Sequence, residues 1–181
     1  MIFQAIDCIR SAMVAAGIPA VLGNIGEILA GNNNAADELV ISLINIEENR
    51  VARNPQNFVR NGTEIRMKNP AVHLDLTLLF TSVRLDGGYE MALQSIQQAI
   101  LFFQGNYVFD HINTPVLDPG IEKLILDLVS LNFEQLHQLW AMLGGRYHPS
   151  VIYRMRMITI DSVSDIVGTP INEITTNYSQ K

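Results

Sequence analysis

The side chains best suited to metal binding or acid–base chemistry are four histidines and one cysteine. The histidines are residues 73, 111, 137 and 148, and none of them belongs to an HExxH motif or to another metal-ligand spacing. His137 lies in a predicted helix and His148 in the turn after it, where capping or surface roles are commoner than a paired metal site. Cys8 has no second cysteine with which to form a CxxC pair or an internal disulfide. The sequence therefore predicts no metal centre and no cofactor.

Nucleophilic and carboxylate chemistry lacks a motif as well. The sequence contains no GxSxG nucleophile elbow, and its serines have no evident base, so triad hydrolysis has no support. Glu47 and Glu48 are adjacent, and a strand would place them on opposite faces, where they could not act as a carboxylate pair. We therefore predict no catalytic residues and no enzyme activity.

What remains is a pattern of charge near the C-terminal end. Residues 135–160 contain no carboxylate but include three arginines, Arg146, Arg154 and Arg156. Arg154 and Arg156 are two residues apart, so they point the same way from a strand. If that face also carries His73 and Asp75, a cross-strand ion pair worth roughly 0.2–1 kcal/mol is possible. Two interpretations stay open: these arginines are solvated, or they dock on a subunit that carries acidic residues.

Hydrophobic periodicity predicts the elements that position these residues. Helices are predicted over residues 1–16, 87–103 and 133–143, and strands over 38–47, 70–83, 121–131 and 151–161. Segment 121–131 fits either an edge strand or the first turns of a helix. Asn132 is a good N-cap with Gln135 at the capping-box position, which favours a strand before it. Residues 17–37, 48–69 and 104–120 are predicted loops, and YVFD in the last of them is a candidate short strand.

This order of elements predicts an α+β fold, with a small four-stranded sheet and helices packed on one of its faces. The sheet is expected to be mainly antiparallel or mixed. The strand over 70–83 alternates, so His73, Asp75 and Thr77 share one face and apolar residues share the other. With 181 residues, the chain is expected to form a single domain over residues 1–161 and a C-terminal tail or arm over 162–181.

Composition limits the classes of partner. Hydrophobic residues make up 48% of the chain and charged residues only 17%, below the roughly 25% usual in soluble domains. This deficit indicates a surface partly covered by partners, unless it is ordinary compositional drift. The net charge of −6 argues against nucleic-acid binding. Because no run approaches the ~18 apolar residues of a membrane span and the start lacks a secretory signal, we expect a cytoplasmic protein without membrane insertion.

Three segments taken together resemble a known family: VISLINIEENRVARNP, NPAVHLDLTLLFTS and LHQLWAMLGGRYHPSVIYRMRMITID. They are similar to the tail-cap, or tail-terminator, proteins of extracellular contractile injection systems of the antifeeding-prophage and Photorhabdus virulence cassette type. The positions that carry the resemblance are Glu48, Asn49, Arg53, Asn54, Pro70, Asp75, Leu76, Leu139, Trp140, Leu143, Gly144, Pro149, Ser150, Val151 and Tyr153. The resemblance spans residues 2–161 in the right order and excludes the tail.

The resemblance implies a non-enzymatic structural role. Six copies would form a ring that closes the distal end of the inner tube and the sheath and sets tail length. The partners would then be further copies of the chain and the tube and sheath proteins, assembled in a bacterial cytoplasm into a particle that can be released. Residues expected at interfaces are Arg53, His73, Asp75, Arg146, Arg154, Arg156 and Asp161.

Two other classes of function stay open at this stage. One is a small α+β domain that binds a ligand or acts as an enzyme, which would need a polar pocket. The other is a different tail or baseplate component at the opposite end of the particle.

Overall fold

The structure is a computed structural model that describes residues 1–31, 38–49, 58–61, 64–68, 72–84, 88–160 and 163–168. Its helices are α1 (Ile2–Ala15), α2 (Ile25–Leu29), α3 (Tyr89–Gly105) and α4 (Phe133–Met142). Its strands are β1 (Ala20–Leu22), β2 (Leu39–Glu48), β3 (Phe58–Asn61), β4 (Glu64–Lys68), β5 (Val72–Ser82), β6 (Val108–Asp110), β7 (Lys123–Val129), β8 (Ser150–Ile160) and β9 (Val163–Gly168).

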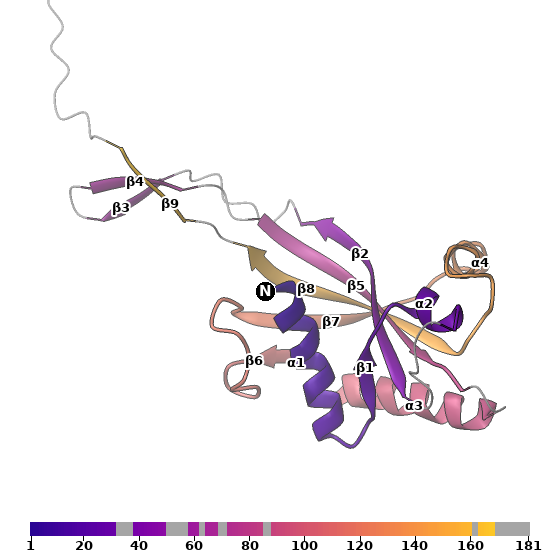
Figure 1. Ribbon diagram of the computed structural model, residues 1–181. Helices are drawn as coiled ribbons and strands as arrows, with labels where there is room; N and C mark the ends of the chain where they lie inside the picture. Colours follow the sequence, from indigo (N-terminus) through magenta and orange to yellow (C-terminus); the bar gives the residue numbers. More distant parts are fainter. Residues whose placement is uncertain are drawn as a thin grey trace, which may run out of the picture.

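The main sheet has six strands in the order β1-β2-β5-β8-β7-β6, and it curls across the body of the molecule (Figure 1). Strand β1 runs parallel to β2, and every other neighbouring pair is antiparallel. The α+β class and the mixed, mainly antiparallel sheet are therefore confirmed, but the predicted count of four strands is wrong. The two additional strands, β1 and β6, are three-residue edge strands, too short to show a clear period of two.

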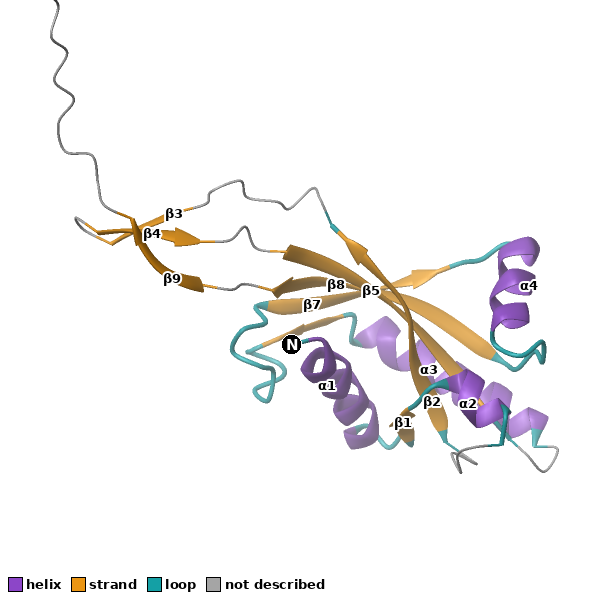
Figure 2. Ribbon diagram, turned by 45° about the horizontal axis from the view of Figure 1, so that its top comes forward, coloured by secondary structure: helices purple, strands orange, loops and turns teal. Residues whose placement is uncertain are grey.

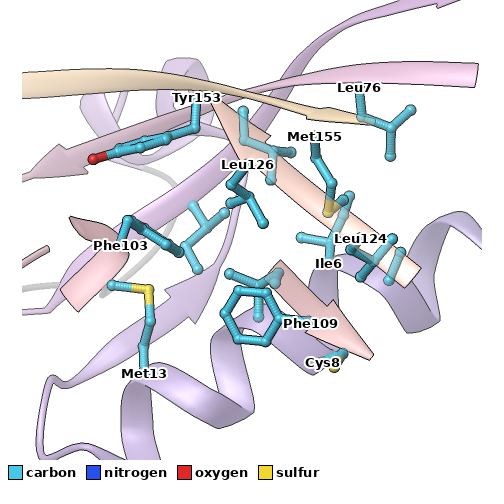
Figure 3. Packing of buried hydrophobic residues seen from close by; sticks show 14 of the residues in the cluster. Ile6, Cys8, Met13, Leu76, Phe103, Phe109, Leu124, Leu126, Tyr153 and Met155 are labelled. Carbon is cyan, nitrogen blue, oxygen red and sulfur yellow. The ribbon is translucent and has the colours of Figure 1, made fainter. Parts of the chain in front are cut away.

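The first face of the main sheet packs against α1 and α3 and forms the larger core. Alternate residues of β5 point into it, and Leu76, Leu78 and Phe80 are fully buried. The ring of Phe80 packs edge-on against those of Phe103 in α3 and Tyr153 in β8, with centroid distances of 5.1 and 5.6 Å. Figure 3 shows Phe103 and Tyr153 together with Phe109, Leu124 and Leu126 in this layer. Burial on this scale makes the first face the main source of hydrophobic stabilisation.

The second face carries a smaller cluster in which Val40, Leu79 and Ile152 pack with residues of α2 and α4. Helices therefore cover parts of both faces, and the prediction of helices on one face only is wrong. Periodicity shows that a helix has an apolar stripe, but it does not show which side of a sheet that stripe meets. Figure 2 shows α4 on the side of the sheet away from α1.

Local sequence signals explain how α4 begins and ends. The Asn132 side chain accepts a hydrogen bond from the Gln135 N–H at 2.8 Å, and the Gln135 side chain accepts one from the Asn132 N–H at 3.0 Å. This reciprocal capping box confirms the predicted start of the helix. Gly144 and Gly145 follow with φ of +109° and +77°, a conformation that disfavours residues with a Cβ. The chain then turns at Pro149 into β8.

The predicted loop over residues 17–37 contains β1 and α2 instead. Asn24 caps α2 by accepting a hydrogen bond from the Gly26 N–H. Gly23 lies so close to the second face that a Cβ there would come within 2.9 Å of Ile28 Cδ1. The glycine-rich GNIG segment therefore serves close packing of a short helix.

A second sheet has three strands in the order β3-β4-β9, all antiparallel. It lies beyond one end of the main sheet, clear of the four labelled helices (Figure 1). Strands β3 and β4 fall in the predicted loop over residues 48–69, and β9 falls in the predicted tail. The tail segment 163–168 is thus a strand that pairs with the middle of the chain.

Candidate functional site

Half of the second face is open and carries charged and polar side chains. Strand register places them in rows, because residues directly opposite each other in antiparallel strands share a face. Asn45, Thr77, Arg154 and Asp127 form one row across β2, β5, β8 and β7. In the next row Glu47 lies opposite Asp75, and Arg156 lies two residues beyond Arg154. We call this surface, with His73, the charged face.

The two arginines of the charged face are paired to acidic residues on strands at either side. Arg156 Nη2 lies 2.6 Å from Asp127 Oδ2 on β7. Arg154 Nη2 lies 4.0 Å from Glu47 Oε2, which it reaches across the intervening strand β5. The arginine side chains are 43% exposed for Arg154 and 42% for Arg156, so solvent weakens both pairs.

The Nε atoms of Arg154 and Arg156 are buried and have no hydrogen-bond acceptor within the part of the chain that the structure describes. A buried donor without an acceptor costs about 1–3 kcal/mol. Arg156 offsets part of this cost with its close contact to Asp127, whereas the Glu47 contact of Arg154 is at the outer limit for an ion pair. Arg154 is therefore the arginine with more unused capacity to bind an anion.

A trough runs under α4 and across part of the charged face. It consists of three adjoining hollows of about 380, 380 and 430 Å³. The first two share Ile44 and Met142, and the second and third share Val129 and Arg154. Leu139 and Ile152 line the middle hollow together with Gln135 and Gln138. Glu47 also lines the middle hollow, and Asp127 and Arg156 line the third, so the trough combines apolar side chains with charges of both signs. Such a surface is suited to binding a partner segment.

Elsewhere, the groups capable of chemistry are scattered. A hollow of about 480 Å³ between α1 and β6 is lined by Cys8, Phe102 and Phe109, and none of the described residues lining it is charged. Burial, followed by the charge of Asp7, raises the pKa of the Cys8 thiol, which disfavours the reactive thiolate. The described ranges contain no group of three or more potential metal-ligating side chains.

Residues 9–173 match the family model described as the Pvc16 N-terminal domain. The chain belongs to this family. The membership confirms the resemblance seen in the three sequence segments.

Two solved structures share the Pvc16 N-terminal domain fold. One is titled as the sheath/tube terminator of an extracellular contractile injection system, PVC, in its extended state, with a TM-score of 0.63 and 15% identity over 100% of this chain. The other is titled as the tube-terminating cap of the anti-feeding prophage, with a TM-score of 0.66 and 16% identity over 96% of this chain. The chain spans 64% and 60% of those proteins. A search of curated proteins gave no significant match.

Within this Pvc16-type domain, the structure brings His73, Asp75, Arg154 and Arg156 onto one face, as strand alternation allows. Asp75 does not pair with either arginine; its carboxylate accepts a hydrogen bond from Asn49 Nδ2 at 3.3 Å. The arginine partners are Glu47 and Asp127, which sequence reasoning missed. These partners can be identified only from the register between neighbouring strands, and the register can be assigned only when the order of the strands in the sheet is known.

The remaining predicted interface residues lie elsewhere. Arg146 is exposed in the turn after α4, where its charge, after burial, contributes to lowering the pKa of His148. Arg53 and Asp161 lie outside the described residues. None of the helices in the described ranges is long and apolar enough to cross a membrane.

Proposed function

We propose that the protein is a structural cap, or terminator, of a phage-tail-like contractile injection system. In this proposal six copies form a ring that closes the distal end of the inner tube and the sheath and sets tail length. The role is non-enzymatic, and the ring assembles in the bacterial cytoplasm before the particle is released. One domain over residues 1–161 forms the body of each subunit, and residues 162–181 form an arm.

The observation that carries the proposal is the family match over residues 9–173. Two solved structures titled as terminators share the fold across 96% or more of the chain, which supports the same role. The low charge content and the excess of nine arginines over three lysines also fit a protein whose surface is largely covered, because interfaces favour arginine over lysine.

The three-stranded sheet supports a mode of sheath attachment. Strand β9 lies at its edge, pairing with β4 on one side only. An edge strand presents unpaired N–H and C=O groups that can receive a strand from another chain. In our proposal, the sheath protein adds a strand to this small sheet.

The oligomeric state tests the ring. Light scattering at several concentrations should give the mass of a hexamer, either for the protein alone or after addition of the tube or sheath protein of the same particle. A protein that stays monomeric in all three conditions would contradict the proposal.

Two further measurements test where the ring binds. Deletion of residues 162–181 should abolish sheath attachment, and attachment that survives the deletion excludes β9 and the arm as the contact. Labelled-antibody microscopy of particles should show the protein at the end away from the baseplate. Label at the baseplate would instead favour a tube-initiating or baseplate component.

A further inference from the structure

The outer surface of α3 is unusually apolar for a surface helix. Its inner residues Ala92, Ala99 and Phe103 are buried against the first face of the main sheet. Five apolar residues on the rest of the helix are nevertheless exposed: Tyr89, Met91, Leu93, Ile100 and Leu101. Exposed glutamines at positions 94, 97, 98 and 104 lie among them, so the outer side is mixed rather than apolar throughout. Five large exposed apolar residues on one helix nevertheless indicate that a partner covers this side.

The same surface carries one charge. Glu90 is the only charged residue of α3 and is exposed in its first turn. Within the described ranges it has no ion-pair partner. Leu93 follows at i+3 and Leu101 at i+11, so both lie on the stripe of the helix that carries Glu90. A partner for α3 should therefore offer apolar side chains, polar groups for the glutamines and a cation for Glu90.

The trough on the second face offers apolar side chains and a cation, beside a second arginine, Arg156, and the carboxylates of Glu47 and Asp127. Leu139, Ile152 and Met142 line the middle hollow, and Met142 is 71% exposed. Arg154 lies where the middle hollow meets the next one, and among the described residues its ion-pair partner is Glu47 at 4.0 Å. A guanidinium has five N–H donors in a planar fork, so Arg154 can keep Glu47 on one edge and receive a second carboxylate on another.

We propose that the outer surface of α3 in one copy of the chain docks in the trough of the next copy, with Glu90 paired to Arg154. The middle hollow shares lining residues with each of the other two, and a continuous trough of this kind suits an extended element such as a helix better than a compact small molecule.

The contact is heterologous. Helix α3 covers the first face of the main sheet and the trough lies on the second, so α3 cannot dock in the trough of its own copy (Figure 2). A head-to-tail contact of this kind generates a ring when the rotation closes. The inference thus names the subunit contact of the proposed ring and rests on the proposed function.

Charge reversal tests the contact by sedimentation and light scattering, alone and with the tube and sheath proteins. Glu90→Arg and Arg154→Glu should each raise the concentration for half-assembly about tenfold or more, because each places like charges in contact. Combined in one chain, they should restore assembly to within about threefold of wild type. Glu122→Arg makes the same change at another exposed site and should assemble like wild type.

The outcomes separate the two proposals. A wild-type protein that stays monomeric with both partner proteins overturns the ring, and the contact with it. If the wild-type protein forms a ring and both single-reversal variants assemble equally well, only the contact is overturned. The contact is also overturned if the double-reversal variant is folded, as measured by circular dichroism, but does not recover assembly.

Cross-linking keeps the contact testable if the reversals unfold the chain. In a Cys8→Ser background, the pair Glu90→Cys and Arg154→Cys should give a ladder of linked subunits with a short bismaleimide. A link within one chain is excluded, because the sheet separates the two positions. The pair Glu122→Cys and Arg154→Cys should stay unlinked. If the Glu90→Cys and Arg154→Cys pair also stays unlinked within an assembled ring, the contact is overturned.

Discussion

The two faces of the main sheet differ in how completely they are covered. On the first face, α1 and α3 close a continuous core around Phe80, Phe103 and Tyr153. On the second face, α2 and the short α4 cover only the half of the sheet near Val40 and Leu79, and the other half carries charged residues. The first face therefore contributes most of the hydrophobic stabilisation, and the open half of the second face is available to bind a partner.

Strand β5 marks the border between the covered and the open half. Toward the first face its residues are apolar from Leu74 to Phe80. Toward the second face it begins with His73, Asp75 and Thr77 and becomes buried only from Leu79 onward. The change from polar to buried residues along β5 thus marks the point at which helix coverage of the second face begins.

The largest difference between the faces should appear in a pair of alanine substitutions on β5. Phe80→Ala removes a fully buried ring and should lower the free energy of unfolding by about 3–5 kcal/mol. Thr77→Ala, on the open half of the second face, should lower it by less than about 1 kcal/mol. Urea denaturation measures both, and equal losses would contradict the assignment of stability to the first face.

On the covered half of the second face, one buried hydroxyl should matter. Ser42 Oγ accepts a hydrogen bond from the Ile25 N–H at 3.1 Å and donates one to the Gly23 carbonyl at 2.6 Å, and so joins α2 to β2. Ser42→Ala leaves both backbone groups without this partner and should cost about 1–3 kcal/mol in urea denaturation. Ser130→Ala, at an exposed serine, should cost no more than about 0.5 kcal/mol.

The same contrast explains which parts of the fold were predictable. Elements with a long apolar pattern, such as β5, β8 and α1, were found from the sequence close to their observed bounds. The short β1 and α2 were missed because they are stabilised by distant contacts such as the Ser42 hydrogen bonds rather than by their own pattern. The hairpin of β3 and β4 was missed although the sequence carries a signal for it, because Glu64–Lys68 alternates charged and apolar residues shortly after an Asn-Gly dipeptide. The signal was overlooked because residues 48–69 as a whole are mostly polar.

The site was predictable to a similar extent. Alternation was enough to place Arg154 and Arg156 on one side of β8. Their partners depend on β2 and β7 lying on either side of the β5–β8 pair, and sequence periodicity contains no information about strand order. The trough depends on α4 crossing the second face, which local sequence does not determine either.

A double-mutant cycle would measure how exposed the charged face is. For Arg156 and Asp127, 2.6 Å apart and each nearly half exposed, we expect a coupling free energy below about 1 kcal/mol that decreases with added salt. For Arg154 and Glu47, 4.0 Å apart, the coupling should be smaller still. Coupling above about 2 kcal/mol in the isolated protein would mean that this half of the sheet is shielded from water.

The smallest expected effect concerns pH and the turn after α4. Burial, and then the charge of Arg146, lowers the pKa of His148 below its ordinary value of 6.5. The unfolded chain therefore binds a proton at this residue more readily than the folded chain does, so stability should fall as pH drops below about 6.5. His148→Gln should flatten the pH dependence of Tm between about pH 7 and pH 5, and Arg146→Gln should flatten it only in part, because burial remains. An unchanged slope in His148→Gln would show that other groups set the acid sensitivity of the fold.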